Sequence, residues 1–261
     1  MEIYTKPALI KKLKGVADKG WILSGRQGNS GGVGNTLEDL LGIKENNLPI
    51  PNAAEWELKC HRIGSQSLTT LFHMDPSPRS LNIVPGILLP KYGWKHQLAG
   101  KKYGRGELSF RQTINAVSRS DRGFKVVVNY EERKVMVSFD PNAVSKVHKK
   151  WLKTVEKRVN LGELDPQPYW GFDDLFHKAG TKLLNCFFVE ATCKKENGRE
   201  YFKYEKVKML SKFSLDKFIK AIEKGSVLVD FDARTGHNHG TKFRLKLNHF
   251  PKLYDIAVDI L

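Results

Sequence analysis

The run Glu57-Leu58-Lys59 holds the residues with the clearest chemical potential in this chain. The alternation from Glu55 to Arg62 predicts a strand, and residues two apart on a strand project from the same face. Glu57 and Lys59 should therefore project together, with Leu58 buried behind them. A carboxylate can hold a hard cation such as Mg²⁺, and a neighbouring ammonium can stabilise charge that develops on a phosphate. The pattern suits metal-assisted phosphodiester hydrolysis, although Glu-x-Lys is also common on solvated strand faces.

The residues upstream of this run give it a context. They include a glycine-rich segment, a short apolar stretch and a Pro-Asn pair, in the order Gly32-x-Gly34-x-Thr36-Leu37-Glu38, Leu40-Leu41-Gly42-Ile43, Asn46-Asn47 and Pro51-Asn52-x4-Glu57-Leu58-Lys59. This order resembles the MvaI/BcnI restriction endonucleases and their relative, the mismatch-repair nicking enzyme MutH, within the PD-(D/E)xK nucleases. The resemblance is clearest over residues 25–75 and looser through the rest of the chain.

The resemblance implies metal-binding carboxylates at positions 38, 52 and 57 and a catalytic lysine at position 59. Glu38, Glu57 and Lys59 match, but position 52 is Asn where the family has Asp. By this resemblance Mg²⁺ would lie between Glu57 and Asn52, Glu38 would position a water molecule, and Lys59 would stabilise the attacked phosphate.

Asn52 is a departure with chemical consequences, because an amide oxygen can coordinate Mg²⁺ but brings no charge. Three explanations remain open. Position 52 carries an engineered Asp→Asn change, the protein is a naturally weakened or inactive relative, or Glu55 or Asp39 supplies the missing charge. The otherwise intact motif favours the first.

A second candidate site is the segment from Asp232 to Arg244. Its Arg234 has a guanidinium fork that can donate to guanine, and Asn238 can pair with a base edge. His-x-His without a third nearby ligand argues against structural zinc, so DNA contact and a solvent-exposed hairpin loop are the competing interpretations. The resemblance adds a histidine on the strand after the active-site strand. The predicted DNA contacts are His73, Arg234, His237, Asn238, His239, Lys242 and Arg244.

The charge balance supports a polyanionic partner. The 261 residues include 44 Lys and Arg against 28 Asp and Glu, a formal net charge of +16, which favours nucleic acid. No apolar run is long enough to span a membrane, and no signal peptide is evident at the N-terminus. Three cysteines predict neither a disulfide framework nor a zinc set, which suits a reducing cytoplasm. The glycine-rich segment 25–35 lacks Gly-Lys-Ser/Thr, so we expect no nucleotide cofactor.

Mixed strands and helices without strict βαβ alternation predict an α/β or α+β protein. Together with the resemblance, they lead us to expect an α/β fold, in which a mixed sheet is flanked by helices and two lobes surround a DNA-binding cleft. A boundary near residue 160 would separate a catalytic lobe, 1–160, from a DNA-recognition lobe, 161–261. Helices are expected at 5–19, 36–42, 142–159, 172–183 and 214–224. Strands are expected at 55–62, 68–74, 108–114, 124–130, 134–139, 185–192, 200–209, 227–231 and 242–247, with loops at 75–105 and 232–241.

Together these features predict a type II restriction endonuclease that hydrolyses double-stranded DNA with Mg²⁺. The resemblance implies a short GC-rich site of the CC-x-GG kind and action as a monomer. The alternatives are a catalytically inactive DNA-binding relative, which Asn52 would suit, and a nicking enzyme of the MutH kind. A basic RNA-binding protein is a further class, but no RNA-binding signature is present.

Overall fold

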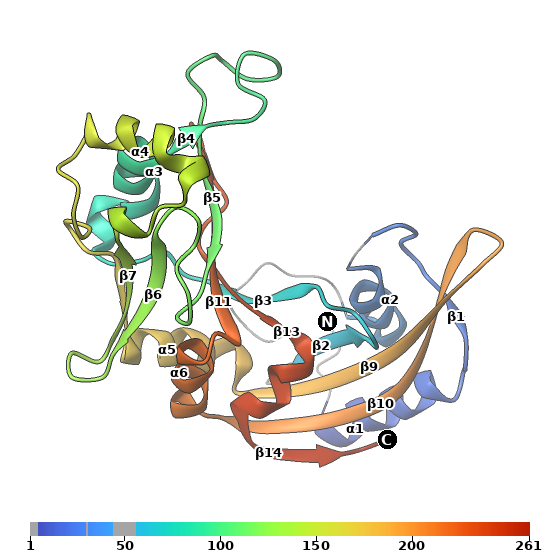
Figure 1. Ribbon diagram of the computed structural model, residues 1–261. Coiled ribbons are helices and arrows are strands. Elements are labelled where there is room, and N and C mark those ends of the chain that lie inside the picture. Colours follow the sequence, from blue (N-terminus) through green and yellow to red (C-terminus); the bar gives the residue numbers. More distant parts are fainter. Residues whose placement is uncertain (1–4, 30, 44–55) are drawn as a thin grey trace. The chain divides into compact units, whose positions relative to one another are not determined.

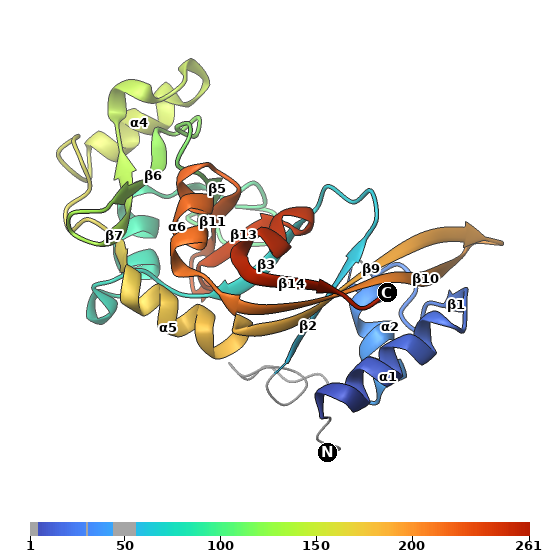
Figure 2. The same ribbon diagram turned by 90° about the horizontal axis from the view of Figure 1, so that it is seen from below.

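The computed structural model describes residues 5–29, 31–43 and 56–261 (Figures 1 and 2). The chain forms two compact units, each assembled from segments that are distant in sequence. Unit 1 comprises Met1–Ser67, Ala179–Ser214 and Lys246–Leu261, and unit 2 comprises Leu68–Lys178 and Leu215–Leu245. The functional division expected near residue 160 stays a prediction. No helix among the described residues has the length and apolar content needed to cross a membrane.

A mixed five-stranded sheet forms the framework of unit 1. Its strands are β1 (Ile22–Leu23), β2 (Glu57–Arg62), β9 (Asn185–Glu196), β10 (Arg199–Phe213) and β14 (Tyr254–Asp259). The order is β1-β10-β9-β2, with β14 also paired to β10. The β2–β9 pair is parallel, whereas β10 runs antiparallel to β1, β9 and β14. β2 therefore lies at an edge of the sheet.

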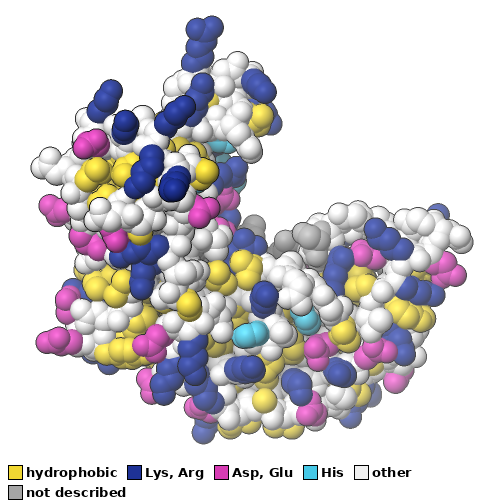
Figure 3. Space-filling model, viewed as in Figure 1, with side chains coloured by type: hydrophobic (Ala, Val, Ile, Leu, Met, Phe, Trp, Pro, Cys, Tyr) yellow, Lys and Arg dark blue, Asp and Glu magenta, His cyan; other side chains and the backbone are white. Residues whose placement is uncertain are grey.

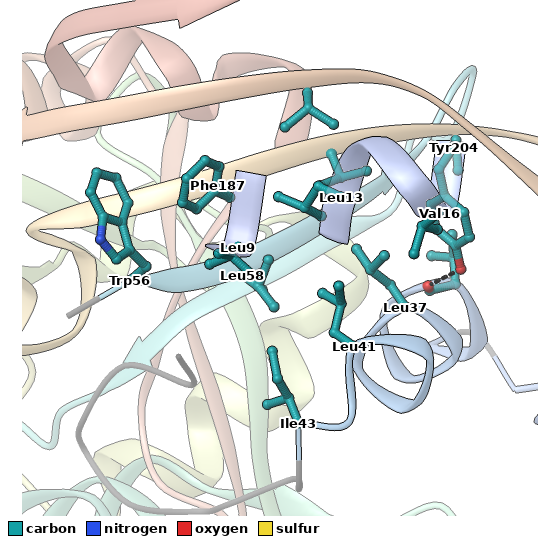
Figure 4. Packing of buried hydrophobic residues seen from close by; sticks show 14 of the residues in the cluster. Leu9, Leu13, Val16, Leu37, Leu41, Ile43, Trp56, Leu58, Phe187 and Tyr204 are labelled. Carbon is teal, nitrogen blue, oxygen red and sulfur yellow. Dashed lines mark hydrogen bonds between the residues drawn. The ribbon is translucent and has the colours of Figure 1, made fainter. Parts of the chain in front are cut away.

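Two helices, α1 (Lys6–Ala17) and α2 (Gly32–Leu41), pack their apolar sides into the core on one face of this sheet. Leucines at helical spacing on both helices are almost fully buried, which gives this face a continuous apolar layer. Figure 4 shows these side chains meeting those of β2 and β9, among them Leu9, Leu13, Leu37, Leu41, Leu58 and Phe187.

The two helices begin and end at identifiable residues. The Thr5 side chain accepts a hydrogen bond from the Ala8 amide at the start of α1. α2 begins at Gly32 and ends before Gly42, which has a φ of 68°. The prediction that this helix starts at residue 36 was wrong. A Cβ at Gly32 would lie 3.0 Å from the Arg26 carbonyl, so glycine lets the helix start close to the preceding loop.

α5 (Phe172–Leu183) matches its predicted bounds and leads into β9. Its first turn carries Asp173 and Asp174, and its last turn carries Lys182. This distribution complements the helix dipole, which favours anions at the N-terminus and cations at the C-terminus.

The larger sheet of unit 2 contains β3 (Leu68–His73), β4 (Trp94–Lys95), β5 (Leu108–Ile114), β11 (Val227–Arg234), β12 (His237–Asn238) and β13 (Lys242–Lys246). Its order is β3-β13-β11-β5-β4, and β12 pairs with β11. Along β11, alternate residues from Val227 to Ala233 are buried, while Asp230, Asp232 and Arg234 are only partly covered. One face of this sheet is therefore apolar and the other is charged.

A three-stranded sheet and several helices complete unit 2. The strands are β6 (Phe124–Asn129), β7 (Lys134–Phe139) and β8 (Tyr169–Gly171), and the α-helices are α3 (Leu89–Tyr92), α4 (Lys149–Glu156) and α6 (Leu215–Glu223). The 3-10 helices are η1 (Arg79–Leu81), η3 (Pro141–Ala143) and η4 (Lys146–His148) in unit 2 and η5 (Leu247–Leu253) in unit 1, and η2 (Ile83–Leu88) is a π-helix. The predicted α/β class is confirmed.

Three predicted segments need correction. The helix expected at 142–159 is limited to α4, because Val144 is extended and separates the 3-10 turns that precede it. The loop expected at 75–105 contains η2 and α3, whose prolines obscured the helical pattern. The loop expected at 232–241 is partly strand, since β11 continues to Arg234 and turns into β12.

Candidate active site

β2 presents its functional side chains on the face of the sheet opposite α1 and α2. Leu58 and Cys60 pack against the α1–α2 core, so the alternate residues Glu57, Lys59 and His61 project from the other face. The predicted juxtaposition of Glu57 and Lys59 follows from this alternation and is present in the structure. The apolar layer behind β2 fixes the direction of both side chains.

Glu57 and Lys59 form a short ion pair, with Lys59 Nζ 2.7 Å from Glu57 Oε1. The Glu57 side chain is 1% exposed and the Lys59 side chain 16%. A carboxylate buried to this degree requires a compensating charge, which Lys59 supplies. Glu57 Oε2 is also buried but has no hydrogen-bond partner among the described residues. One oxygen of the carboxylate is thus neutralised, and the other is left with acceptor capacity.

β9 lines the same face beside β2. The parallel register places Cys186 opposite Glu57, Phe188 opposite Lys59 and Glu190 opposite His61. Burial raises the pKa of the Cys186 thiol well above its ordinary value, and the Glu57 charge adds to this effect. Burial likewise raises the pKa of Tyr254, which interacts with Cys186. Both groups therefore stay protonated, so the Cys186 thiol and the Tyr254 hydroxyl are uncharged neighbours of Glu57.

His61 projects from the same face of β2 as Lys59, and Glu190 is its register partner on β9. His61 is 7% exposed, and its ring stacks on Phe188 with centroids 6.2 Å apart. Burial lowers the pKa of His61, while the Glu190 carboxylate acts in the opposite direction. A neutral imidazole is therefore favoured beside Lys59.

Glu38 approaches β2 from α2 and is half-buried. Burial is the main cause of the raised pKa of Cys60, and the Glu38 charge contributes to it. α2 packs on the face of β2 that carries Leu58 and Cys60, so Glu38 belongs to a helix on the opposite face from Glu57 and Lys59. That Glu38 and Glu57 act together in catalysis remains a prediction.

A divalent cation would find one suitable ligand among the described residues, the buried Oε2 of Glu57. No group of three or more His, Cys, Asp or Glu side chains is arranged for a metal within residues 5–29, 31–43 and 56–261. Asn52 and Glu55 lie outside the described residues, so the remaining predicted ligands are not placed. Asp39 is largely exposed and lies 3.9 Å from Arg26. Glu57 fits a hard cation, and the full ligand set remains a prediction.

The glycine-rich segment before α2 is held by β10 and β2. Gln27 donates to the Ser24 and Glu200 carbonyls and accepts from the Glu200 amide. Arg62 donates to the Glu200 carboxylate at 2.7 Å and to the Asn29 carbonyl at 3.0 Å. These bonds tie the segment to the sheet that carries Glu57.

The predicted DNA contacts all lie in unit 2, on or beside its larger sheet. His73 ends β3 and approaches Gly240, where an added Cβ would lie 3.6 Å from its ring. His237 and His239 are exposed and meet edge to face with centroids 4.1 Å apart. Asn238 accepts a hydrogen bond from the Gly240 amide. The structure thus brings the four residues of this group together at one end of the sheet.

The three remaining predicted contacts are cations with acidic partners. Arg234 pairs with Glu107 at 3.0 Å and lies over the Tyr103 ring. Lys242 pairs with Asp232 at 2.9 Å, and Arg244 with Asp230 at 3.0 Å. Burial opposes ionisation of Asp232, but hydrogen bonds from Lys242 and Arg111 lower its pKa overall. These ion pairs hold the cations along one charged face.

Basic side chains are abundant elsewhere on the surface. Figure 3 shows Lys and Arg side chains gathered over the region of α4 and β4. Lys149, Lys150, Lys153 and Lys157 in and after α4 are exposed. This distribution suits a polyanionic partner.

Sequence reasoning missed Lys182, Cys186 and Tyr254 as neighbours of Glu57. Lys182 Nζ lies 3.9 Å from Glu57 Oε1. Lys182 ends a helix, whereas Cys186 and Tyr254 belong to apolar stretches typical of buried strands. Their proximity to Glu57 depends on the parallel β2–β9 pairing and, for Tyr254, also on the pairing of β14 with β10, and the local sequence carries no signal for either.

Comparison with known proteins identifies a family and similar solved structures. The model of the MvaI/BcnI restriction endonuclease family matches residues 10–254. The chain is similar to the restriction endonuclease MvaI in a complex with its cognate DNA substrate, with a TM-score of 0.74 and 25% identity over 99% of this chain and 100% of that chain. It is also similar to MvaI in the absence of DNA, with a TM-score of 0.60 and 25% identity over all of both chains. No curated protein matches significantly.

Proposed function

The chain belongs to the MvaI/BcnI restriction endonuclease family, and from this premise we propose that it is a Mg²⁺-dependent type II enzyme. Its reaction is the hydrolysis of phosphodiester bonds in double-stranded DNA at a short GC-rich site of the CC-x-GG kind. The similar structure of MvaI with its cognate DNA supports DNA as the substrate.

The observation that carries this proposal is the difference between the contacts of the two Glu57 carboxylate oxygens. One oxygen pairs with Lys59 at 2.7 Å, and the other is buried without a hydrogen-bond partner among the described residues. Leaving such an acceptor unsatisfied costs free energy, so a purely structural role is a poor explanation. A role as a cation ligand accounts for both oxygens, because Oε1 pairs with Lys59 and Oε2 remains available to coordinate the cation.

The residues have distinct roles in this proposal. Glu57 and Asn52 would hold Mg²⁺, which when bound would polarise the phosphate and promote the ionisation of water. Lys59 stabilises negative charge on the attacked phosphate. Glu38 positions the attacking water.

Recognition is assigned to the seven unit 2 residues His73, Arg234, His237, Asn238, His239, Lys242 and Arg244. The described bonds of Arg234 use Nη1, which leaves Nη2 and Nε to donate to a guanine edge. The Glu107 pair and the Tyr103 ring would hold the guanidinium in orientation for that contact. Lys242 and Arg244, paired with aspartates, suit phosphate or base contacts whose geometry is fixed in advance.

The proposed enzyme acts as a monomer in the cytoplasm without a nucleotide cofactor, and cuts one strand at a time. Asn52 favours a second candidate, a DNA-binding relative with weak or no catalysis, because the amide brings no charge to the metal. A nicking enzyme of the MutH kind would differ in leaving one strand intact.

A plasmid cleavage experiment separates these functions. The protein is incubated with supercoiled plasmid in Mg²⁺ or in EDTA, and the product ends are mapped by sequencing. Linear products with ends at CC-x-GG in Mg²⁺ alone support the proposal. Nicked circles that are never linearised support the nicking enzyme, and DNA binding without strand cleavage supports the inactive relative.

A further inference from the structure

Glu57 has a second lysine neighbour besides Lys59. Lys182 Nζ lies 3.9 Å from Glu57 Oε1, and the Lys182 side chain is 25% exposed. In the part of the site that the structure describes, two ammonium groups therefore lie near the buried Glu57 carboxylate. Lys182 belongs to no part of the Glu57-Leu58-Lys59 motif.

The fold fixes Lys182 at this place. It lies in the last turn of α5, where its neighbour Leu183 is fully buried. The chain then enters β9 at Asn185, and Cys186 is the register partner of Glu57. Only three residues separate Lys182 from Cys186, so the end of α5 must lie close to the Glu57 carboxylate.

The charges around Glu57 explain why the Lys182 ammonium group can bind an anionic ligand. At 2.7 Å, Lys59 satisfies Glu57 Oε1, whereas 3.9 Å is too long for a hydrogen bond from Lys182. Among the described residues, Glu57 is the carboxylate paired with these two ammonium groups, and it can neutralise one of them, which leaves an excess of one positive charge around Glu57. A DNA phosphodiester carries one negative charge and complements that excess.

We propose that Lys182 is a second active-site lysine that binds a DNA phosphate beside the Glu57–Lys59 pair. This inference rests on the proposed function, because it takes DNA as the ligand. If Lys182 served only to neutralise Glu57, its removal would change stability but not the number of phosphate contacts.

The test is the salt dependence of DNA binding without divalent metal. Wild type, Lys182→Gln and Lys182→Arg are titrated against one duplex containing a CC-x-GG site, in EDTA, between 50 and 200 mM monovalent salt. Lys11→Gln is the matched control, because exposed Lys11 lies on α1, which covers the opposite face of the sheet. Thermal melting of each variant verifies folding.

Loss of one phosphate contact lowers the logarithmic salt slope by about 0.9. For Lys182→Gln, the ratio of wild-type to variant affinity should therefore change by about 3.5-fold between 50 and 200 mM salt. Lys182→Arg and Lys11→Gln should keep the wild-type slope. If the glutamine variant does not fold, Lys182→Met, which removes the charge but keeps the apolar stem, takes its place and should show the same reduced slope.

An unchanged slope for folded Lys182→Gln, or a reduced slope for folded Lys182→Arg, would overturn the inference. If wild-type protein binds DNA with a steep salt dependence and Lys182→Gln has the same slope, the inference about Lys182 fails but the proposed function is unaffected. Wild-type protein that neither binds nor cuts DNA would instead overturn the proposed function.

Discussion

Variants of the Glu57–Lys59 pair should affect the free energy of unfolding and DNA cleavage differently. Replacing Lys59 by Met removes the ammonium but keeps an apolar stem of similar length. Glu57, 1% exposed, then has only Lys182 as a described charge partner, at 3.9 Å. Breaking a buried pair by removing one partner costs about 3–5 kcal/mol. We expect about 3 kcal/mol, the lower end of that range, because Lys182 remains nearby.

A double variant tests the cause of this loss. Adding Glu57→Gln to Lys59→Met removes the uncompensated charge, so about 2 kcal/mol should return, within the range of coupling between contacting residues. Cleavage should not return. Loss of one group that stabilises developing charge costs about 10²–10³-fold in rate, and the double variant also lacks the carboxylate.

The assays are equilibrium urea unfolding at pH 7 and single-turnover plasmid cleavage in Mg²⁺. Wild type, both single variants and the double variant complete the cycle. The reasoning is refuted if Lys59→Met unfolds like wild type, or if the double variant is less stable than Lys59→Met. Retention of wild-type cleavage by either lysine variant would refute the catalytic role.

Three further predictions concern other parts of the chain. Leu37→Ala in the fully buried α1–α2 core should cost about 2–5 kcal/mol of unfolding free energy, measured by urea unfolding; no loss would contradict the packing. Burial lowers the pKa of His61, so the unfolded chain binds its proton first and stability falls as pH drops below about 6.5. His61→Gln should flatten the unfolding free energy between pH 7 and 5, by at most about 1.4 kcal/mol per pH unit, and an unchanged pH profile would contradict this. Arg234→Ala should cost about 1–3 kcal/mol in binding to a cognate duplex and relax discrimination at one base pair, whereas an equal loss on all sequences would indicate phosphate contact.

The parts of the fold that follow local rules could be predicted from sequence. β5 and β7 have the predicted bounds because each is a short run that contains apolar and β-branched residues and is bounded by turn residues. α5 also has its predicted bounds, with an acidic first turn and a basic last turn. Glu57 and Lys59 share a face for the same local reason, since strand geometry alone brings residues two apart together.

Other features depend on contacts that the local sequence does not encode. The two-residue strand β1 exists only because Ile22 and Leu23 pair with the distant β10. α2 begins at Gly32, a poor helix former, where an added Cβ would lie only 3.0 Å from the Arg26 carbonyl. Lys182 reaches Glu57 only through the parallel pairing of β2 with β9. Such non-local pairings explain why the second lysine escaped sequence reasoning.

The central claim is that the site at Glu57 and Lys59 cleaves DNA with Mg²⁺, at a rate limited by Asn52. Single-turnover cleavage of a CC-x-GG plasmid by wild type, Asn52→Asp and Glu57→Gln, with DNA binding measured in parallel, tests it most directly. The account predicts Mg²⁺-dependent cleavage by wild type, faster cleavage by Asn52→Asp, and DNA binding without cleavage by Glu57→Gln. Undiminished cleavage by Glu57→Gln, or no cleavage by wild type and Asn52→Asp while both bind DNA, would contradict it.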